Sequence, residues 1–200
     1  KIIPSSAFKN CTSLVSVEIP DSVSVFESSA FEGCISLKLI NIPNALKNIH
    51  NNAFRKCSSL LSLDLGEIES LGSGVFEYCT SLTSIQFSGN IIYFENNLFS
   101  GCSSLQEVTI PETLQEVRKI AFHDCSSLTK LTFAEGLTKI GDYAFSGSGI
   151  KEIDLPNSVQ LIGERAFWQS NNLISIELPQ NLTSLCSEAF WQCAKLERVV

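Results

Sequence analysis

The residues best suited to catalysis in this 200-residue chain are two histidines, His50 and His123, and eight cysteines. No His-Glu-x-x-His zinc motif, glycine-rich phosphate loop or EF-hand loop surrounds them. We expect no Ser-His-Asp or Cys-His arrangement around either histidine, so no activated nucleophile is predicted. The sequence therefore predicts no active site and no cofactor. Both histidines are interpreted as surface or turn residues.

Most of the cysteines share one spacing along the chain. They are Cys11, Cys34, Cys57, Cys79, Cys102, Cys125 and Cys193. No Cys-x-x-Cys pair occurs and no histidine joins the series, so no zinc site is predicted. We expect buried free thiols that act as small apolar fillers, because a disulfide between equivalent positions would demand local movement. Cys186 lies outside the series and is expected to be the more exposed and reactive thiol.

The cysteine spacing belongs to a larger repeat in which phenylalanine returns every 22 or 23 residues. The members are Phe8, Phe31, Phe54, Phe76, Phe99, Phe122, Phe145, Phe167 and Phe190. Leucine, valine and isoleucine recur at fixed distances from each of them. A fixed period over the whole length predicts a solenoid whose turns bury each other's apolar residues. On this stack the two histidines would lie on the order of 15 Å apart, from the spacing between strands.

One unit of the repeat reads L-x-x-V-x-I-P-x-x-V-x-x-I-G-x-x-A-F-x-x-C-x-x. The V-x-I stretch alternates with a period of two, which predicts a short strand that ends at the proline. The V-x-x-I-G segment is expected to cross a turn, and A-F-x-x-C returns the chain. Stacked strands would form one parallel sheet at a spacing of about 4.8 Å. Shortened units at Gly66-Glu67-Ile68 and at residues 146–150 predict local distortion and no domain boundary.

This pattern resembles the BspA-like, or treponemal-type, leucine-rich repeats over essentially the whole chain. The best copies are Ser5–Leu14 and Lys139–Phe145, and the combination of I-G-x-x-A-F, cysteine and proline is the specific part. The resemblance implies a leucine-rich-repeat solenoid of about nine repeats, forming one continuous domain over residues 1–200. It implies a parallel β-sheet on the concave face, with short turns or irregular or helical segments on the convex side. It also implies a cell-surface or secreted microbial protein that binds other macromolecules.

Composition narrows the choice of partners. The formal charge of −7 and the pI of about 4.9 argue against nucleic acid and against anionic membranes. No apolar run of about 18 residues occurs, so no membrane insertion is predicted. The chain begins and ends inside repeats that lack polar caps, so we interpret it as a fragment of a longer array whose ends can self-associate.

The outward positions of the predicted strands form the candidate ligand-binding face. The central column consists of Glu18, Asn41, Asp64, Gln86, Thr109, Thr132, Asp154 and Glu177. Three interpretations are open: a solvated face that prevents aggregation, a face that binds protein or glycan, or a cation bridged by Glu152, Asp154 and Glu177. Asp154 and Glu177 are expected to be stacked neighbours whose like charges repel.

Trp168 and Trp191 occupy the same position in successive repeats, directly after the phenylalanine, where the other repeats hold polar or charged residues. Either the rings pack on each other and extend the core, or they form an apolar patch that binds a partner or a second copy. Two functions follow from these observations. The first is non-catalytic recognition at the surface of a microbe, by adhesion or by binding of host proteins or glycans, including extracellular matrix. The alternative is an intracellular interaction scaffold or sensor.

Overall fold

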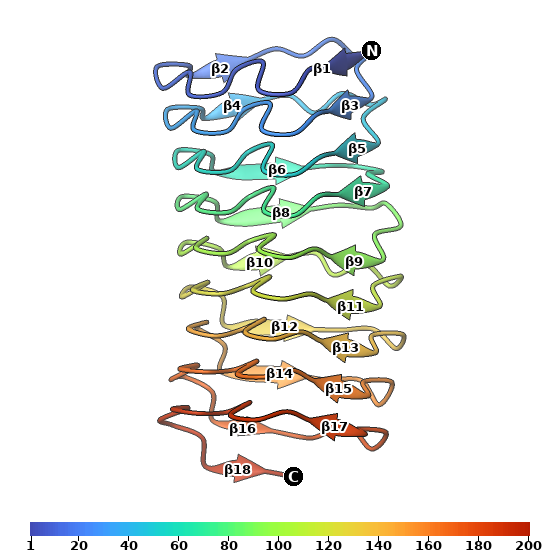
Figure 1. Cartoon of the computed structure of the whole chain (residues 1–200), viewed down its shortest axis with the longest axis vertical. Helices are drawn as coiled ribbons and strands as arrows, with labels where there is room; N and C mark the ends of the chain where they lie inside the picture. The colour runs from blue at the N-terminus through green and yellow to red at the C-terminus, as the bar shows by residue number, and fades with distance from the viewer.

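The computed structural model describes all residues from 1 to 200 and contains eighteen short β-strands and no helix. The chain winds into a parallel-strand β-solenoid of about nine turns that stack along one axis (Figure 1). The predicted leucine-rich-repeat solenoid is thereby confirmed. No helix of the length and apolarity needed to cross a membrane is present.

The strands predicted from the V-x-I stretches form the row that we call the even row. It consists of β2 (Ser16–Val17), β4 (Leu39–Ile40), β6 (Ser62–Asp64), β8 (Ser84–Gln86), β10 (Glu107–Val108), β12 (Lys130–Thr132), β14 (Glu152–Asp154), β16 (Ser175–Ile176) and β18 (Arg198–Val199). Alternation places the middle residue of each longer strand in the core and its neighbours in solvent.

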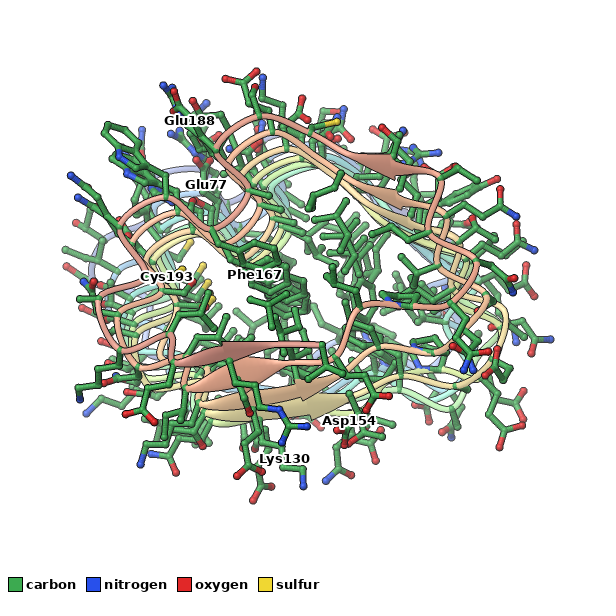
Figure 2. The ribbon with its side chains drawn as sticks, turned by 90° about the horizontal axis from the view of Figure 1, so that it is seen from below. Glu77, Lys130, Asp154, Phe167, Glu188 and Cys193 are labelled. Atoms are coloured by element: carbon green, nitrogen blue, oxygen red, sulfur yellow. The ribbon has the colours of Figure 1, made fainter.

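A second row of strands, the odd row, lies where the sequence predicted only a turn. It consists of β1 (Ile2–Ile3), β3 (Val25–Phe26), β5 (Asn48–Ile49), β7 (Ser70–Leu71), β9 (Tyr93–Phe94), β11 (Glu116–Val117), β13 (Lys139–Ile140), β15 (Leu161–Ile162) and β17 (Ser184–Leu185). Figure 2 shows the two rows on opposite sides of each turn, with apolar side chains packed between them.

The strands pair in parallel but do not form the single continuous sheet that was expected. The odd row divides into β1-β3-β5-β7 and β9-β11-β13-β15-β17, and the even row into β2-β4, β6-β8-β10, β12-β14 and β16-β18. Wherever one row is interrupted, the other row remains hydrogen-bonded across the same pair of turns. Figure 1 shows the wider spacing at β7/β9 and at β10/β12. Each turn is therefore held on at least one side.

The shortened unit at Gly66-Glu67-Ile68 lies next to the β7/β9 interruption, so the expected local distortion is found there. A Cβ on Gly89 would lie 1.8 Å from the carbonyl oxygen of Ile68, so only glycine fits against this turn. At the second shortened unit, residues 146–150, the β12–β14 and β13–β15 pairings continue without a break.

The third side of each turn is an arc of tight turns around the repeated phenylalanine. Its amide groups alternate in direction: Lys9 N–H donates to Ser6 O at 3.1 Å within the arc, whereas Phe8 N–H donates to Ala30 O of the next turn at 2.8 Å. Two positions in every arc, two residues before and two after the phenylalanine, have positive φ. Asparagine or glycine suits such positions, but Ile120 also adopts one, with a φ of 62°.

The core is a continuous column of stacked aromatic rings. Phe31 and Phe54 stack with ring centroids 5.3 Å apart and planes 6° apart, and the same arrangement links each repeated phenylalanine to the next. Phe94 meets Phe99 edge-on at 5.9 Å. These rings are fully buried except at the two ends of the stack, so apolar burial is the main stabilising term.

Candidate functional site

The even row presents the predicted ligand-binding column to solvent. All eight residues of that column, Glu18, Asn41, Asp64, Gln86, Thr109, Thr132, Asp154 and Glu177, are exposed. Asp154 and the neighbouring Lys130 point away from the core in Figure 2. The column thus follows the whole length of the stack as a regular polar surface.

Two members of this column use their side chains to support the backbone. The Asn41 carboxamide accepts a hydrogen bond from Ile19 N–H at 2.6 Å and donates one to Ile19 O at 2.8 Å. Asp64 Oδ1 accepts from Gly66 N–H at 3.0 Å and stabilises the shortened turn. Asn41 and Asp64 are therefore less free to contact a ligand than the other six.

Asp154 and Glu177 face each other across an interruption of the even row, because β14 and β16 are not hydrogen-bonded. A groove of about 420 Å³ opens between them and is also lined by Glu152, Ser175 and Asn157. Like charges on neighbouring strands repel, which is consistent with the missing pairing between β14 and β16. These carboxylates do not form a group that could hold a metal ion, so the cation-bridging interpretation gains no support.

The two tryptophans stack on each other. Their ring centroids lie 6.0 Å apart with planes 15° apart, and Trp168 Nε1 donates to Gln192 Oε1 at 3.1 Å. Tyr143 packs edge-on against Trp168 at 6.1 Å. Trp168 is half-buried, and Trp191 remains 46% exposed. The geometry is that of rings packed on their neighbours, with one face of the pair still open to solvent.

Arg165 ties this aromatic cluster to the arc. Its guanidinium lies 5.4 Å from the centroid of the Trp191 ring, donates from Nε to Glu188 Oε2 at 2.5 Å, and donates to the Tyr143 hydroxyl at 2.5 Å. The hydrogen bonds to Glu188 and Tyr143 raise the pKa of Arg165. Because Arg165 and Glu188 satisfy each other, the cluster offers aromatic surface and no free charge.

The cysteine series forms a column of thiols that is more than an apolar filler. Cys57 Sγ donates to Phe31 O at 3.1 Å, and Cys79 repeats this contact with Phe54 O. Burial raises the pKa of Cys57 well above its ordinary value of 9.0 and that of Cys34 to about 11. Six thiols make this hydrogen bond, namely Cys34, Cys57, Cys79, Cys102, Cys125 and Cys193.

Exposure of the cysteines differs from the expectation at one end of the column. Cys11 belongs to the series but is exposed, because it lies in the first turn and no preceding turn covers it. Cys186 is of intermediate exposure, and its Sγ lies 3.8 Å from Ser184 Oγ. Cys11 is therefore the more accessible of the two thiols.

The expectation that no Ser-His-Asp arrangement surrounds either histidine is wrong for His123. His123 lies between a serine and an aspartate: its Nδ1 is 2.7 Å from Ser146 Oγ, and its Nε2 is 3.2 Å from Asp124 Oδ2. This contact was not predicted from the sequence, although both His123 and Ser146 directly follow a repeated phenylalanine and are therefore neighbours in successive turns. Ser146 is fully buried and donates its hydroxyl proton to Tyr143 O at 3.0 Å. The arrangement therefore lacks an accessible nucleophile, unlike a catalytic triad.

The same position in the first four turns carries an alternating ion ladder that the sequence analysis also missed. Lys9 Nζ lies 2.9 Å from Glu32, Glu32 lies 3.2 Å from Arg55, and Arg55 Nε lies 2.5 Å from Glu77. Burial alone would raise the pKa of Glu32, but hydrogen bonds from Lys9 and Ser29 outweigh it and lower the pKa. The ladder is part-buried and internally satisfied, so it stabilises the arc and leaves no charge for a ligand.

Comparison with proteins of known structure places these features in a family. A family model described as "BspA type Leucine rich repeat region (6 copies)" matches residues 1–128 and 93–200. A leucine-rich repeat protein from Bacteroides ovatus is 28% identical, with a TM-score of 0.78 over 99% of this chain and 58% of its own. One from Eubacterium ventriosum is 22% identical, with a TM-score of 0.60 over 76% of this chain and 47% of its own.

The leucine-rich repeat protein of T. pallidum is 26% identical and has a TM-score of 0.53 over 92% of this chain and 68% of its own. A search among curated proteins finds no match. The chain thus spans 58% and 47% of the lengths of the B. ovatus and E. ventriosum proteins. Repeats of this kind are protein-binding modules in general and are typically non-catalytic. The chain belongs to the BspA-type leucine-rich repeat family.

Proposed function

We propose that this array is a non-catalytic recognition module of a microbial cell-surface or secreted protein, and that it binds a protein or glycan partner through the even row. The observation that carries this proposal is the exposed polar column that runs along the whole stack. A solenoid offers such a long surface more readily than an enclosed site. Adhesion to host extracellular matrix is the form of recognition that the family resemblance favours.

The side chains on this surface suit recognition. Gln86, Thr109 and Thr132 are exposed, uncharged residues near the middle of the column, and their side chains can both donate and accept hydrogen bonds. Asp154 and Glu177 add an acidic groove toward one end. A partner with hydrogen-bonding groups opposite the centre and basic groups opposite the groove would match this surface.

The cluster of Trp168 and Trp191 is a second candidate contact. Tryptophan is enriched where interfaces concentrate their binding energy, and Trp191 keeps nearly half of its surface exposed. Self-association through this cluster or through the solenoid ends is part of the same proposal.

A binding screen against extracellular-matrix proteins and glycans tests the proposal. Asp154→Ala/Glu177→Ala and Trp168→Ala/Trp191→Ala identify the contact surface, and Gln115→Ala/Lys139→Ala on the odd-row side is the matched control. We expect one of the first two variants to lose binding selectively while its thermal unfolding stays unchanged. Equal binding by all variants would contradict a role for these surfaces.

A further inference from the structure

The interruption between β7 and β9 leaves backbone groups of the odd row free. At the intact junction between β5 and β7, Gly72 N–H donates to Ile49 O at 2.8 Å. The equivalent bond from Glu95 N–H to Leu71 O is absent, and Ile92 N–H also lacks its partner in the preceding turn. The two strands lie further apart here than at the other junctions of the row (Figure 1). Ladder donors and an acceptor are thus available at this surface.

A depression of about 230 Å³, which we call the β7/β9 depression, lies at this interruption. Four apolar residues and two glutamates supply most of its lining, namely Leu71, Ile91, Ile92, Tyr93, Glu69 and Glu95. Leu71 and Ile91 are buried, so the base of the depression is apolar. Its volume is below the roughly 300–1,000 Å³ of sites for drug-sized ligands, so it suits a single ring.

Ile92 departs from the repeat at this depression. The equivalent positions of the other turns hold only polar or charged residues, namely Lys1, Ser24, Lys47, Glu69, Gln115, Thr138, Gln160 and Thr183. Some of these side chains bond to the carbonyl group of the preceding turn, as Thr138 Oγ1 does to Gln115 O at 3.1 Å. Ile92 cannot make this contact and is 42% exposed. A ligand that covers Ile92 therefore removes apolar surface that no neighbouring turn covers.

Tyr93 adds an aromatic ring beside Ile92. Arg118 of the following turn lies over this ring, with its Cζ 4.0 Å from the ring centroid. Arg118 Nη1 also donates to Glu95 Oε1 at 2.6 Å, which holds the guanidinium in place. Tyr93 lines the depression from the side of the preceding turn, opposite Arg118. One face of the ring is thus covered by the guanidinium, and the other is available for stacking.

The two carboxylates of the depression are balanced by cations. Glu95 pairs with Arg118, and Glu69 Oε1 lies 3.6 Å from Lys47 Nζ. The second oxygen of each carboxylate takes part in neither pair and can accept hydrogen bonds from hydroxyl groups. Because both charges are matched, the depression favours a neutral ligand that carries hydrogen-bond donors.

We propose that the β7/β9 depression binds a neutral pyranose ring. The apolar C–H face of the sugar stacks on Tyr93 and Ile92, and its hydroxyl groups donate to Glu69 and Glu95. An apolar side chain of a protein would fill the same space but leave these carboxylates and the free backbone groups without partners, which costs binding energy. The site lies on the odd row and is therefore additional to the surface proposed for the even row.

Saturation-transfer difference NMR with simple glycosides tests this site. The probes are the methyl glycosides of glucose, galactose, mannose and N-acetylglucosamine, beside the corresponding free sugars, which show whether a linked ring is accepted. We expect saturable binding of at least one methyl glycoside, with a Kd of about 1–10 mM. Methyl glucuronide adds a negative charge and should bind about tenfold more weakly. N-acetyl-leucinamide represents an apolar protein side chain and should bind more weakly than the best glycoside.

Variants of the protein locate the binding. Tyr93→Ala removes the stacking surface and is expected to weaken the best glycoside about tenfold, whereas Tyr93→Phe keeps the ring and should stay within about twofold of the parent. Ile92→Thr restores the usual polar residue and should also weaken binding. Lys139→Ala, in the same repeat column as Tyr93 but outside the depression, is the control and should bind like the parent. Thermal unfolding verifies that each variant folds.

Three results would overturn the inference. They are no saturable binding of any neutral glycoside, equal binding by the parent and Tyr93→Ala, and tighter binding of methyl glucuronide or N-acetyl-leucinamide than of the best glycoside. Shifts of the Ile92 and Glu95 amide resonances on binding are the positive signature in the parent protein. Asp154→Ala/Glu177→Ala should leave glycoside binding unchanged. If glycosides fail to bind while that variant loses a matrix partner, recognition by the even row stands and the odd-row site fails.

Discussion

The thiol of Cys102 donates a hydrogen bond to the carbonyl oxygen of Phe76, one turn earlier in the stack, over 3.0 Å. Ser170 makes the same contact to Phe145 O at 2.8 Å with a hydroxyl group. The position therefore needs a small side chain that fills the core and donates one hydrogen bond to the preceding turn. This requirement explains why every repeat has either cysteine or serine there, while the surrounding core is aliphatic and aromatic.

Truncating this side chain should destabilise the stack. Cys102→Ala is expected to lower the free energy of unfolding by roughly 1–3 kcal/mol, because it leaves a void and removes the donor. Cys102→Ser keeps the donor and should cost less. Urea denaturation of both variants measures the difference, and an equal or larger loss in Cys102→Ser would show that the hydrogen bond contributes nothing.

Reactivity of the thiols should follow their place in the column. Burial raises the pKa of Cys193 and Cys34 to about 11 and raises the pKa of Cys79 well above 9.0. Only the thiolate reacts with iodoacetamide, so at pH 8.5 Cys11 should be modified within minutes while the buried thiols remain intact. Peptide mapping by mass spectrometry measures this, and early modification of Cys79 would contradict the burial of the column.

The same shifts give stability an alkaline limit. A thiol whose pKa is raised in the folded state stays protonated there, while the unfolded chain loses its proton near pH 9. Its contribution to stability is complete below pH 9 and is lost as the pH rises toward 11. The free energy of unfolding should therefore fall between pH 9 and 11, and less so in Cys34→Ser. An identical pH dependence in the parent and in Cys34→Ser would count against this explanation.

The aromatic column should show position-dependent energetics. Phe99 stacks on Phe76 at 5.7 Å and on Phe122 at 5.2 Å, whereas Phe8 has one stacking neighbour and is only partly buried. Phe99→Ala is expected to lower the free energy of unfolding by about 3–5 kcal/mol. Phe8→Ala should cost clearly less. Urea denaturation measures both variants. Equal losses of unfolding free energy in the two would mean that the second stacking neighbour and the fuller burial of Phe99 contribute nothing to stability.

The fold could be predicted from the sequence because the same pattern recurs in every turn. Each repeat places a phenylalanine, a leucine and a V-x-I stretch in the same columns, so one irregular turn does not hide the period. The odd row could not be predicted, because the apolar residues of its V-x-x-I segment are three positions apart and do not alternate with a period of two. The positions with positive φ left a partial signal in glycines and asparagines such as Gly101 and Asn52.

The candidate surfaces were predicted to different extents. Alternation alone placed the exposed column correctly on the even row, because a side chain's face follows from its register in the strand. The interruptions at β4/β6 and at β10/β12 could not be predicted, since residues on either side of them resemble those at intact junctions. The contact between His123 and Ser146 could have been predicted from the sequence, since the two residues occupy the same repeat position in successive turns.

Ile120 is the residue whose local conformation suits it least. Its φ of 62° is costly for a β-branched side chain, and the equivalent positions of two other arcs hold Asn52 and Asn97 with the same φ of 60°. Ile120→Asn is expected to raise the free energy of unfolding by about 0.5–1 kcal/mol. Ile110→Asn, at a partly buried position without positive φ, is the control and should destabilise. Destabilisation by both variants would show that packing of Ile120 outweighs its backbone strain.

The ion ladder of the arc should give stability an acid limit. The pKa of Glu32 is lowered in the folded state, so its contribution is present above its ordinary value of 4.5 and is lost as the pH falls through the lower folded value. Lys9→Met removes the nearest cation and should reduce the loss of unfolding free energy between pH 6 and pH 3, by less than about 1 kcal/mol. Lys56→Met, an exposed lysine of the arc that takes part in no ion pair, should keep the parental pH dependence. Urea denaturation across this pH range measures both variants. If Lys9→Met and Lys56→Met show the same pH dependence of the free energy of unfolding, the ion ladder is only a consequence of the stacking and does not stabilise it.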